Sequence, residues 1–339
     1  MFQYCAFLLC ALLVSAKDVA EGKANLIELN DGRKMPSFGL GTWLSDADPT
    51  KPFDSQAAAV KEAVESAIDA GYRHIDTASI YNTEKQVGEA INKKIIDGDI
   101  AREDIFVTTK LWNDAHAKDD VVPTLKESLA KLNLSYVDLY LIHWPISSSK
   151  TRQLLPKEID YLETWQGMIE ARRLGLAKSI GVSNFNEAFV QRLIDSTSVA
   201  PAVLQVELNL NLQQPQLLQY CREHNIAVMG YTPFGSVFGA KSYSATPPPP
   251  PRASDPMLQD LAKKHKKTVA QVILRYLHEL GVVPIPKSVK KERIEENINI
   301  FDFSLDQQDR DQLKAFDVHY RCVNPIWWSN STYYPFEKQ

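Results

Sequence analysis

The sequence has few cysteines and no large excess of charge of either sign. Of its 339 residues only 4 are cysteine, and two of these, Cys5 and Cys10, lie among the first sixteen. The other two, Cys221 and Cys322, are too few for a disulfide-stapled scaffold. With 38 Lys+Arg against 42 Asp+Glu, the formal net charge is -4, which argues against nucleic-acid binding through a bulk basic field. A hydrophobic content of 44% is ordinary for a globular protein and argues against extended disorder.

The N-terminus carries a short apolar run whose character changes at Lys17. Met1–Ala16 contains no charged side chain, and its only polar residues are Gln3 and Ser15. The run is shorter than the roughly 20 residues that span a membrane. It ends in Val14-Ser15-Ala16, the small-x-small pattern of a signal-peptidase site. A buried N-terminal helix is the alternative. We predict a signal peptide at 1–16 and a secreted domain at 17–339, in which the sequons at Asn133 and Asn330 are candidate glycan sites.

Strand-like and helix-like segments alternate after Lys17. Leu26–Leu29 and Lys34–Pro36, separated by an Asp-Gly pair, predict a short hairpin. Eight strands are predicted after it, at Ser37–Thr42, His74–Ala78, Ile105–Leu111, Val137–Trp144, Ala177–Ser183, Val203–Leu208, Ala227–Tyr231 and Val282–Pro286. Helical patterns are found at Gln56–Ala70, Val121–Leu132, Tyr161–Leu174, Asn186–Ser196, Gln214–Glu223, Asp255–Leu280 and Asp306–Phe316.

Eight strands alternating with helices predict a single-domain α/β fold, a (β/α)8 (TIM) barrel preceded by the hairpin. A doubly wound open sheet is the alternative, but Gly39-Leu40-Gly41 is not followed by the third glycine of a dinucleotide fingerprint. The run Pro247–Pro251 predicts a stiff loop over the barrel mouth rather than a bare linker between domains. The tail His319–Gln339 holds six Phe, Trp and Tyr residues, which predicts that it packs on an apolar surface near the mouth.

Four polar residues fall at the predicted C-terminal ends of strands, where barrels carry their catalytic groups. Asp76 lies near the end of its strand with Tyr81 five residues later, Lys110 lies near the end of the next strand, and His143 near the end of the one after. A buried charge is costly unless it is paired, and an Asp–Lys pair beside a Tyr meets that cost. We expect the ammonium to lower the pKa of the phenol, so that Tyr81 can donate a proton to a carbonyl oxygen. A neutral His143 can orient that carbonyl by hydrogen bonding.

The chain resembles the aldo-keto reductases over nearly its whole length from Leu26 to Phe336. The resemblance rests on these motifs: Gly71-Tyr72-Arg73-His74-Ile75-Asp76-Thr77-Ala78 with Tyr81, Val87-Gly88-Glu89-Ala90-Ile91, Thr109-Lys110-Leu111-Trp112, Asp138-Leu139-Tyr140-Leu141-Ile142-His143-Trp144-Pro145, Gly181-Val182-Ser183-Asn184-Phe185 and Ile285-Pro286-Lys287-Ser288. It implies a barrel that binds NADP(H) without a Rossmann motif. It also implies Tyr81 as general acid, Lys110 as the group that tunes it, Asp76 as anchor and His143 as carbonyl orienter.

The resemblance further implies an NADPH site. Ser183, Asn184 and Gln205 match positions that bind the nicotinamide carboxamide, and Tyr231 matches the residue that stacks on its ring. The remaining expected cofactor contacts are Thr42, Trp43, Thr232 and Ser236, then Lys287, Ser288 and Arg293 for the 2′-phosphate, and Glu296 with Asn297 for the adenine. Cations and a hydroxyl after the last strand also fit a phosphate site at a barrel mouth, although alone they would equally fit a solvated surface.

The chain departs from the family pattern in two loops. Some members latch the loop after the seventh strand over the cofactor with an acidic residue, but Val237-Phe238-Gly239 contains no acid, so no such latch is expected. The loop Ser45–Ser55 is about ten residues longer than in well-known mammalian members. We expect an aromatic substrate pocket lined by Trp43, Ile80, Trp112, His143, Trp144, Trp327 and Trp328.

Such a pocket suits a steroid, a lipid aldehyde or an aromatic carbonyl. An export signal on this fold resembles the insect haemolymph enzymes that reduce 3-dehydroecdysteroids. We therefore expect a carbonyl substrate of this kind, and we expect the protein to be a monomer. Two alternatives stay open. A metal-dependent hydrolase could use His74 and Asp76, but it would need further ligands, and Lys110 would repel a metal. A catalytically inactive barrel could serve as an extracellular carrier.

Overall fold

A computed structural model describes residues 22–44, 53–239, 242–244 and 246–337. Eight parallel strands follow one another in sheet order from β3 to β10. They are β3 (Leu40–Gly41), β4 (His74–Asp76), β5 (Phe106–Leu111), β6 (Val137–Ile142), β7 (Ala177–Ser183), β8 (Val203–Glu207), β9 (Ala227–Tyr231) and β10 (Val282–Pro284). The first and last strands meet, because the Gly39 amide donates to the Pro284 carbonyl at 3.1 Å and Gly41 forms a parallel bridge with Lys287. The predicted barrel is confirmed.

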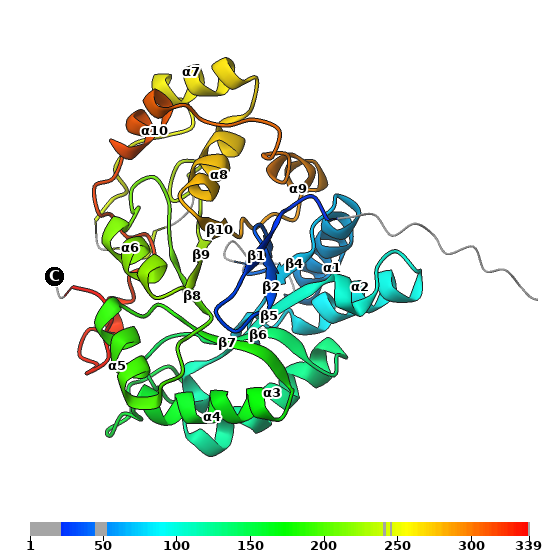
Figure 1. Cartoon of the computed structure of the whole chain (residues 1–339), viewed down its shortest axis with the longest axis vertical. Helices are drawn as coiled ribbons and strands as arrows, with labels where there is room; N and C mark the ends of the chain where they lie inside the picture. The colour runs from blue at the N-terminus through cyan, green and yellow to red at the C-terminus, as the bar shows by residue number, and fades with distance from the viewer. Residues whose placement is uncertain (1–21, 45–52, 240–241, 245, 338–339) are drawn as a thin grey trace, which may run out of the picture.

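The predicted hairpin is also confirmed, and it covers one end of the barrel. Strands β1 (Leu26–Glu28) and β2 (Lys34–Pro36) pair antiparallel and appear dark blue in Figure 1. Leu29 and Met35 are buried in the cluster that holds interior strand residues such as Leu139 and Met229. The hairpin therefore packs against the apolar interior of the barrel.

Helices surround the strands, as Figure 1 shows. They are α1 (Phe53–Asp69), α2 (Glu84–Ile96), α3 (Lys118–Leu132), α4 (Tyr161–Arg173), α5 (Glu187–Thr197), α6 (Pro215–Glu223), α7 (Pro256–His265), α8 (Val269–Glu279), α9 (Lys291–Asn297) and α10 (Gln307–Lys314). Short 3-10 turns are η1 (Ser79–Tyr81), η2 (Arg102–Asp104), η3 (Asn113–Ala115) and η4 (Ile326–Trp328). The main hydrophobic core lies between the strands and this outer layer.

The structure corrects one helix prediction and shows two further helices. The single helix expected over 255–280 is two helices, because Lys266 takes a left-handed conformation at φ 54° and Thr268 begins α8 with a capping box. Helices α2 and α9 were not predicted. In α2, Gly88 interrupts the helix-forming residues, yet a Cβ there would lie 2.3 Å from the Leu132 carbonyl oxygen. Glycine at 88 therefore permits the close approach of α2 to α3.

Two chain segments contribute to the mouth of the barrel, because Tyr243 of the loop between β9 and α7 and Trp328 of the tail line the same cavity. The proline run belongs to the loop between β9 and α7 and is held by Asn211, whose Nδ2 donates to the Pro250 carbonyl at 2.7 Å. The run thus lies between two strands, β9 and β10, of the same eight-stranded sheet. The aromatic tail packs as predicted, with Trp328 and Tyr334 buried against Trp144.

Some predictions lie outside the described residues, namely the signal peptide at 1–16 and most of the long loop at 45–55. Cys221 and Cys322 are both buried free thiols. No helix within the described ranges is long and apolar enough to cross a membrane.

Candidate active site

The four residues of the expected catalytic tetrad meet at the C-terminal end of the barrel. Lys110 Nζ lies 2.6 Å from Asp76 Oδ1 and 2.9 Å from the Thr77 carbonyl oxygen. The same ammonium lies 3.2 Å from the Tyr81 hydroxyl, and the Tyr81 ring is 5.7 Å from the His143 ring between centroids. Three strands thus bring together side chains that the sequence separates by up to 67 positions.

The Asp76–Lys110 pair is fully enclosed. The Lys110 side chain has no exposed surface, and that of Asp76 is 3% exposed. Burial raises the pKa of Asp76 and lowers that of Lys110, while their mutual attraction opposes both shifts. The second carboxylate oxygen of Asp76 accepts a hydrogen bond from Gln205 Nε2 at 2.8 Å. Both charges are therefore compensated by protein groups, as the cost of burying them requires.

The pKa of Tyr81 moves opposite to the expected direction. Burial raises it well above its ordinary value, and the negative charge of Asp76 adds to that increase. Lys110 does not overcome burial because its charge is already shared with Asp76, 2.6 Å away. Tyr81 therefore keeps its proton at neutral pH, and the nearby ammonium is placed to stabilise the phenolate when that proton leaves.

His143 fits the expected neutral imidazole. Burial lowers its pKa well below its ordinary value, and the positive charge of Lys110 lowers it further. The ring packs edge-on against Trp112, with centroids 5.0 Å apart. A neutral ring at this position can hydrogen-bond a carbonyl oxygen without competing for the proton of Tyr81.

The residues expected to hold the nicotinamide are linked to the tetrad by hydrogen bonds. Asn184 Nδ2 donates to the His143 carbonyl at 2.9 Å, and the Tyr231 hydroxyl donates to Asn184 Oδ1 at 2.8 Å. Gln205 contacts Asp76 as described above. All four expected positions line the mouth cavity: Ser183, Asn184, Gln205 and Tyr231.

The remaining expected cofactor contacts divide into two groups. The residues of the first group that line the mouth cavity are Thr42, Trp43, Thr232 and Lys287. Ser236, four residues after Thr232, is buried. Its hydroxyl oxygen has no hydrogen-bond partner among the residues that the structure describes. A buried hydroxyl without a partner is costly, and a phosphate oxygen would supply the missing partner.

The second group, Ser288, Arg293, Glu296 and Asn297, does not line that cavity, although the resemblance assigns all four to the cofactor. Arg293 is exposed on α9, whereas Asn297 is buried. Glu296 Oε1 accepts a hydrogen bond from Thr268 at 2.7 Å. These residues follow the last strand, and their assignment to the cofactor stays a prediction.

The mouth cavity has a volume of about 450 Å³ and an aromatic lining. All seven residues expected to contact substrate line it: Trp43, Ile80, Trp112, His143, Trp144, Trp327 and Trp328. Trp43 stacks on the Tyr81 ring at 5.9 Å between centroids. The aromatic wall therefore begins at the expected proton donor.

A model of the aldo/keto reductase family matches residues 37–318. The chain belongs to the aldo/keto reductase family. Aldo-keto reductase AKR2E4 of Bombyx mori is 48% identical over 92% of this chain and 99% of its own. The crystal structure of that enzyme in complex with NADP covers the same shares at a TM-score of 0.87. The crystal structure of AKR2E5 complexed with NADPH is 42% identical, covering 93% of this chain and 94% of its own at a TM-score of 0.86. Aldo-keto reductase family 1 member C18 of Rattus norvegicus is 38% identical over 94% of this chain and 99% of its own.

The metal-hydrolase alternative finds no support in this aldo/keto reductase. His74 Nε2 lies 3.0 Å from Thr108 Oγ1. Both carboxylate oxygens of Asp76 already accept hydrogen bonds, from Lys110 and Gln205. Within the described ranges, no group of three His, Cys, Asp or Glu residues could hold a metal ion.

Sequence reasoning missed Glu207, which anchors the aromatic tail. Its carboxylate is fully buried and accepts hydrogen bonds at 2.8 Å from the backbone amides of Cys322 and Val323. It also accepts one from Asn209 Nδ2 at 3.0 Å. A charged residue near the end of an apolar strand was the available signal, because a buried carboxylate requires donors.

Tyr243 and Arg152 were also missed, and both line the mouth cavity. Tyr243 stacks on Trp43 with centroids 6.4 Å apart, and its backbone amide donates to the Cys322 carbonyl at 2.7 Å. The loop after β9 is therefore bound to the tail by a backbone hydrogen bond. This contact does not involve Val237-Phe238-Gly239, the stretch in which no acidic latch was expected. Both residues lie in irregular loops, where no periodicity indicates which side chains face inward.

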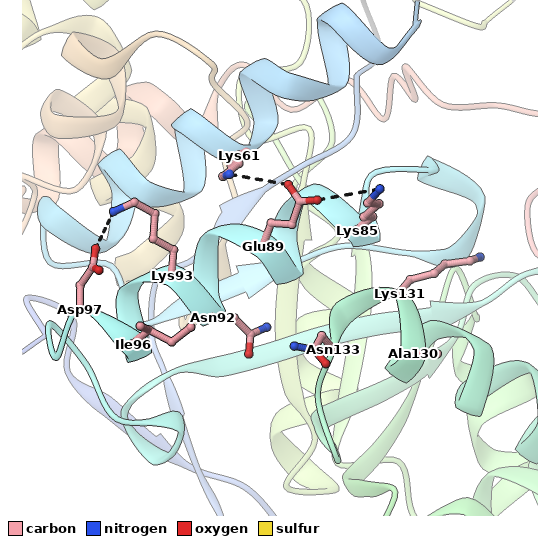
Figure 2. A pocket seen from close by; sticks show the side chains of 10 residues that line it. All are labelled: Lys61, Lys85, Glu89, Asn92, Lys93, Ile96, Asp97, Ala130, Lys131 and Asn133. Atoms are coloured by element: carbon pink, nitrogen blue, oxygen red, sulfur yellow. Dashed lines mark hydrogen bonds and ion pairs between the residues drawn. The ribbon is translucent and has the colours of Figure 1, made fainter.

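A second hollow lies on the outer surface between α1, α2 and α3 (Figure 2). Its lysines are engaged with neighbouring acids: Lys61 and Lys85 reach Glu89 at 3.7 and 4.0 Å, and Lys93 reaches Asp97 at 2.5 Å. Such exposed pairs are typical of a solvated surface. The predicted sequon residue Asn133 is exposed at the edge of this hollow.

Proposed function

We propose that this aldo/keto reductase uses NADPH to reduce a bulky, apolar ketone or aldehyde, such as a 3-ketosteroid or a 3-dehydroecdysteroid. The observation that carries the proposal is the aromatic cavity that leads from the protein surface to Tyr81 and His143. Apolar walls favour substrates that bury a large apolar surface, by about 25 cal/mol per Å² removed from water. A small sugar would gain much less from the same walls.

The protein is an oxidoreductase by family membership, and its residues suit NADP(H). The unpartnered Ser236 hydroxyl and the Lys287 side chain fit phosphate oxygens, while Asn184 and Gln205 fit an amide such as that of nicotinamide. When bound, NADPH supplies a hydride to the carbonyl carbon. The roles of the protein residues are proposed from this geometry.

Tyr81 holds the proton that passes to the carbonyl oxygen, which completes the alcohol. Lys110, 3.2 Å from the Tyr81 hydroxyl, stabilises the phenolate left behind. Asp76 holds Lys110 in place, and His143 donates a hydrogen bond that orients the carbonyl. Proton transfer by a positioned side chain contributes about 10² to 10⁴ in rate.

The test is a substrate panel with the purified protein, followed by loss of NADPH absorbance. The panel contains 5α-dihydrotestosterone, 3-dehydroecdysone, 4-nitrobenzaldehyde and xylose. We expect higher kcat/KM for the three bulky or aromatic compounds than for xylose. A preference for the sugar would refute the proposed substrate class.

Tyr81→Phe is the matched variant, because it removes only the hydroxyl. We expect it to abolish reduction while NADPH binding, measured by protein fluorescence, stays nearly unchanged. Substantial turnover by this variant would contradict the role of Tyr81. Inactivity of the unmodified protein with tight steroid binding would instead favour the extracellular carrier.

We also propose that the protein is secreted as a monomer after cleavage near Ala16. The apolar run and the small-x-small pattern support export, and burial that raises the pKa of Cys221 to about 12 suits a free thiol outside the cell. Expression in insect cells should give a secreted chain whose N-terminal sequence starts near Lys17, with light scattering at the mass of one chain. A chain that stays in the cells with Met1 intact would refute export.

A further inference from the structure

Arg152 is held at the rim of the mouth cavity by its backbone. It lies in the loop between β6 and α4, where Ser148 and Leu154 form an antiparallel bridge. Its amide donates to the Ser149 carbonyl at 2.9 Å, and its φ of 63° is left-handed. Its carbonyl oxygen accepts a hydrogen bond from the buried Trp328 indole at 3.0 Å. The loop and the tail together therefore fix where this side chain starts.

Arg152 lines the cavity, and its guanidinium group lies beside Trp112, another lining residue. Its Cζ lies 5.9 Å from the centroid of the Trp112 ring. Within the part of the chain that the structure describes, it forms no ion pair. Among the cavity-lining residues of that part, the only carboxylate is Asp76, which Lys110 and Gln205 already engage. A substrate would therefore meet a cation whose charge no cavity carboxylate neutralises.

The distance from Arg152 to the reacting groups has an upper bound that limits the length a ligand needs. The Trp112 ring is close to both Arg152 and His143, at 5.9 Å from the Arg152 Cζ and 5.0 Å from the His143 ring centroid. The guanidinium is therefore at most about 11 Å from the His143 ring. A molecule with its carbonyl at Tyr81 and His143 thus needs to extend no further than about two or three rings to present a group to Arg152.

We propose that Arg152 binds an anionic group, such as a carboxylate, a phosphate or a sulfate ester, at the end of the substrate remote from its carbonyl. This inference rests on the proposed carbonyl reduction. Arginine suits the task because its planar donors can bind two oxygens of such a group at once. Because the side chain is exposed, solvent screening reduces the gain, and we expect a preference of about tenfold rather than the hundredfold of a buried site.

The test compares charged and neutral members of matched substrate pairs. One pair is 4′-formylbiphenyl-4-carboxylate and its methyl ester, and the other is the 17-sulfate of 5α-dihydrotestosterone and the free steroid. We expect the charged member of each pair to have the higher kcat/KM, mainly through a lower KM. Raising the salt concentration should reduce this preference.

Three variants assign the preference to Arg152. Arg152→Gln should reduce the charged-to-neutral ratio of kcat/KM about tenfold, while Arg152→Lys should retain part of it. Lys150→Gln is the matched control, because Lys150 is exposed in the same loop but does not line the cavity, and it should leave the ratio unchanged. Thermal melting checks that each variant is folded.

The outcomes separate this inference from the proposed function. No preference for the charged member, or an equal fall of the ratio in Lys150→Gln, would overturn the role of Arg152 while reduction of the neutral steroid still stands. Failure to reduce either member of both pairs would overturn the proposed function instead.

Discussion

Lys110→Met should destabilise the protein strongly, because it leaves the carboxylate of Asp76 buried without its cation. Lys110 Nζ is 2.6 Å from that carboxylate, and neither side chain has more than 3% exposure. After the substitution, Gln205 would be the one side chain still donating to Asp76 within the described residues. Removing one partner of a buried ion pair costs about 3 to 5 kcal/mol. We expect a loss of this size in the free energy of unfolding.

The double variant Asp76→Asn, Lys110→Met separates stability from catalysis. It removes both charges, so most of the lost stability should return, since neutral replacement of a buried pair is often harmless. Activity should stay at least about 100-fold reduced in both the single and the double variant, because neither retains the ammonium beside Tyr81.

Urea unfolding followed by tryptophan fluorescence measures these changes, with NADPH oxidation measured in parallel. Lys93→Met is the control, because Lys93 forms an exposed pair with Asp97 on the surface of α2, and it should leave the unfolding midpoint unchanged. The reasoning is refuted if Lys110→Met loses less than about 1 kcal/mol, or if the double variant is no more stable than the single one.

Two further predictions concern the cofactor and pH. Arg293→Ala should weaken NADPH binding far more than NADH binding, because Arg293 is assigned to the 2′-phosphate; equal losses measured by fluorescence titration would show that assignment to be wrong. Burial lowers the pKa of His116 from 6.5 to about 3. Between pH 6.5 and about 3, His116 binds a proton in the unfolded chain but stays neutral in the folded chain. The free energy of unfolding therefore decreases as the pH drops below 6.5, by about 1.4 kcal/mol per pH unit. His116→Gln should lessen this slope by that amount in urea unfolding at pH 5 to 7, and an unchanged slope would contradict the assignment.

The sequence was sufficient to predict the barrel, because its signals are local. The strands Ala177–Ser183 and Ala227–Tyr231 have the predicted bounds, and the second is a continuous run without charged residues, as is typical of strands in parallel sheets. Polar residues at the ends of such runs located the tetrad, and Trp112 and Trp144 follow strands in the same way. The break at Lys266 was missed because a left-handed residue between two amphipathic segments leaves their periodicity almost intact.

The positions of loop residues and the titration of buried groups could not be predicted from the sequence. Glu207 reaches the tail, and Arg152 reaches the cavity, through contacts between segments far apart in the chain. The pKa of Tyr81 depends on the competition between burial and charges, and burial is a property of the assembled structure.

The sequence by itself thus determined the order of strands and helices, the tetrad and the family, because residue types at fixed spacings specify them. Only the tertiary structure decided that burial outweighs Lys110 in setting the pKa of Tyr81, that Glu207 binds the tail, and that Arg152 lines the cavity. The physical reason is that these properties depend on distances and solvent exclusion, which arise only when the barrel closes between Gly41 and Lys287.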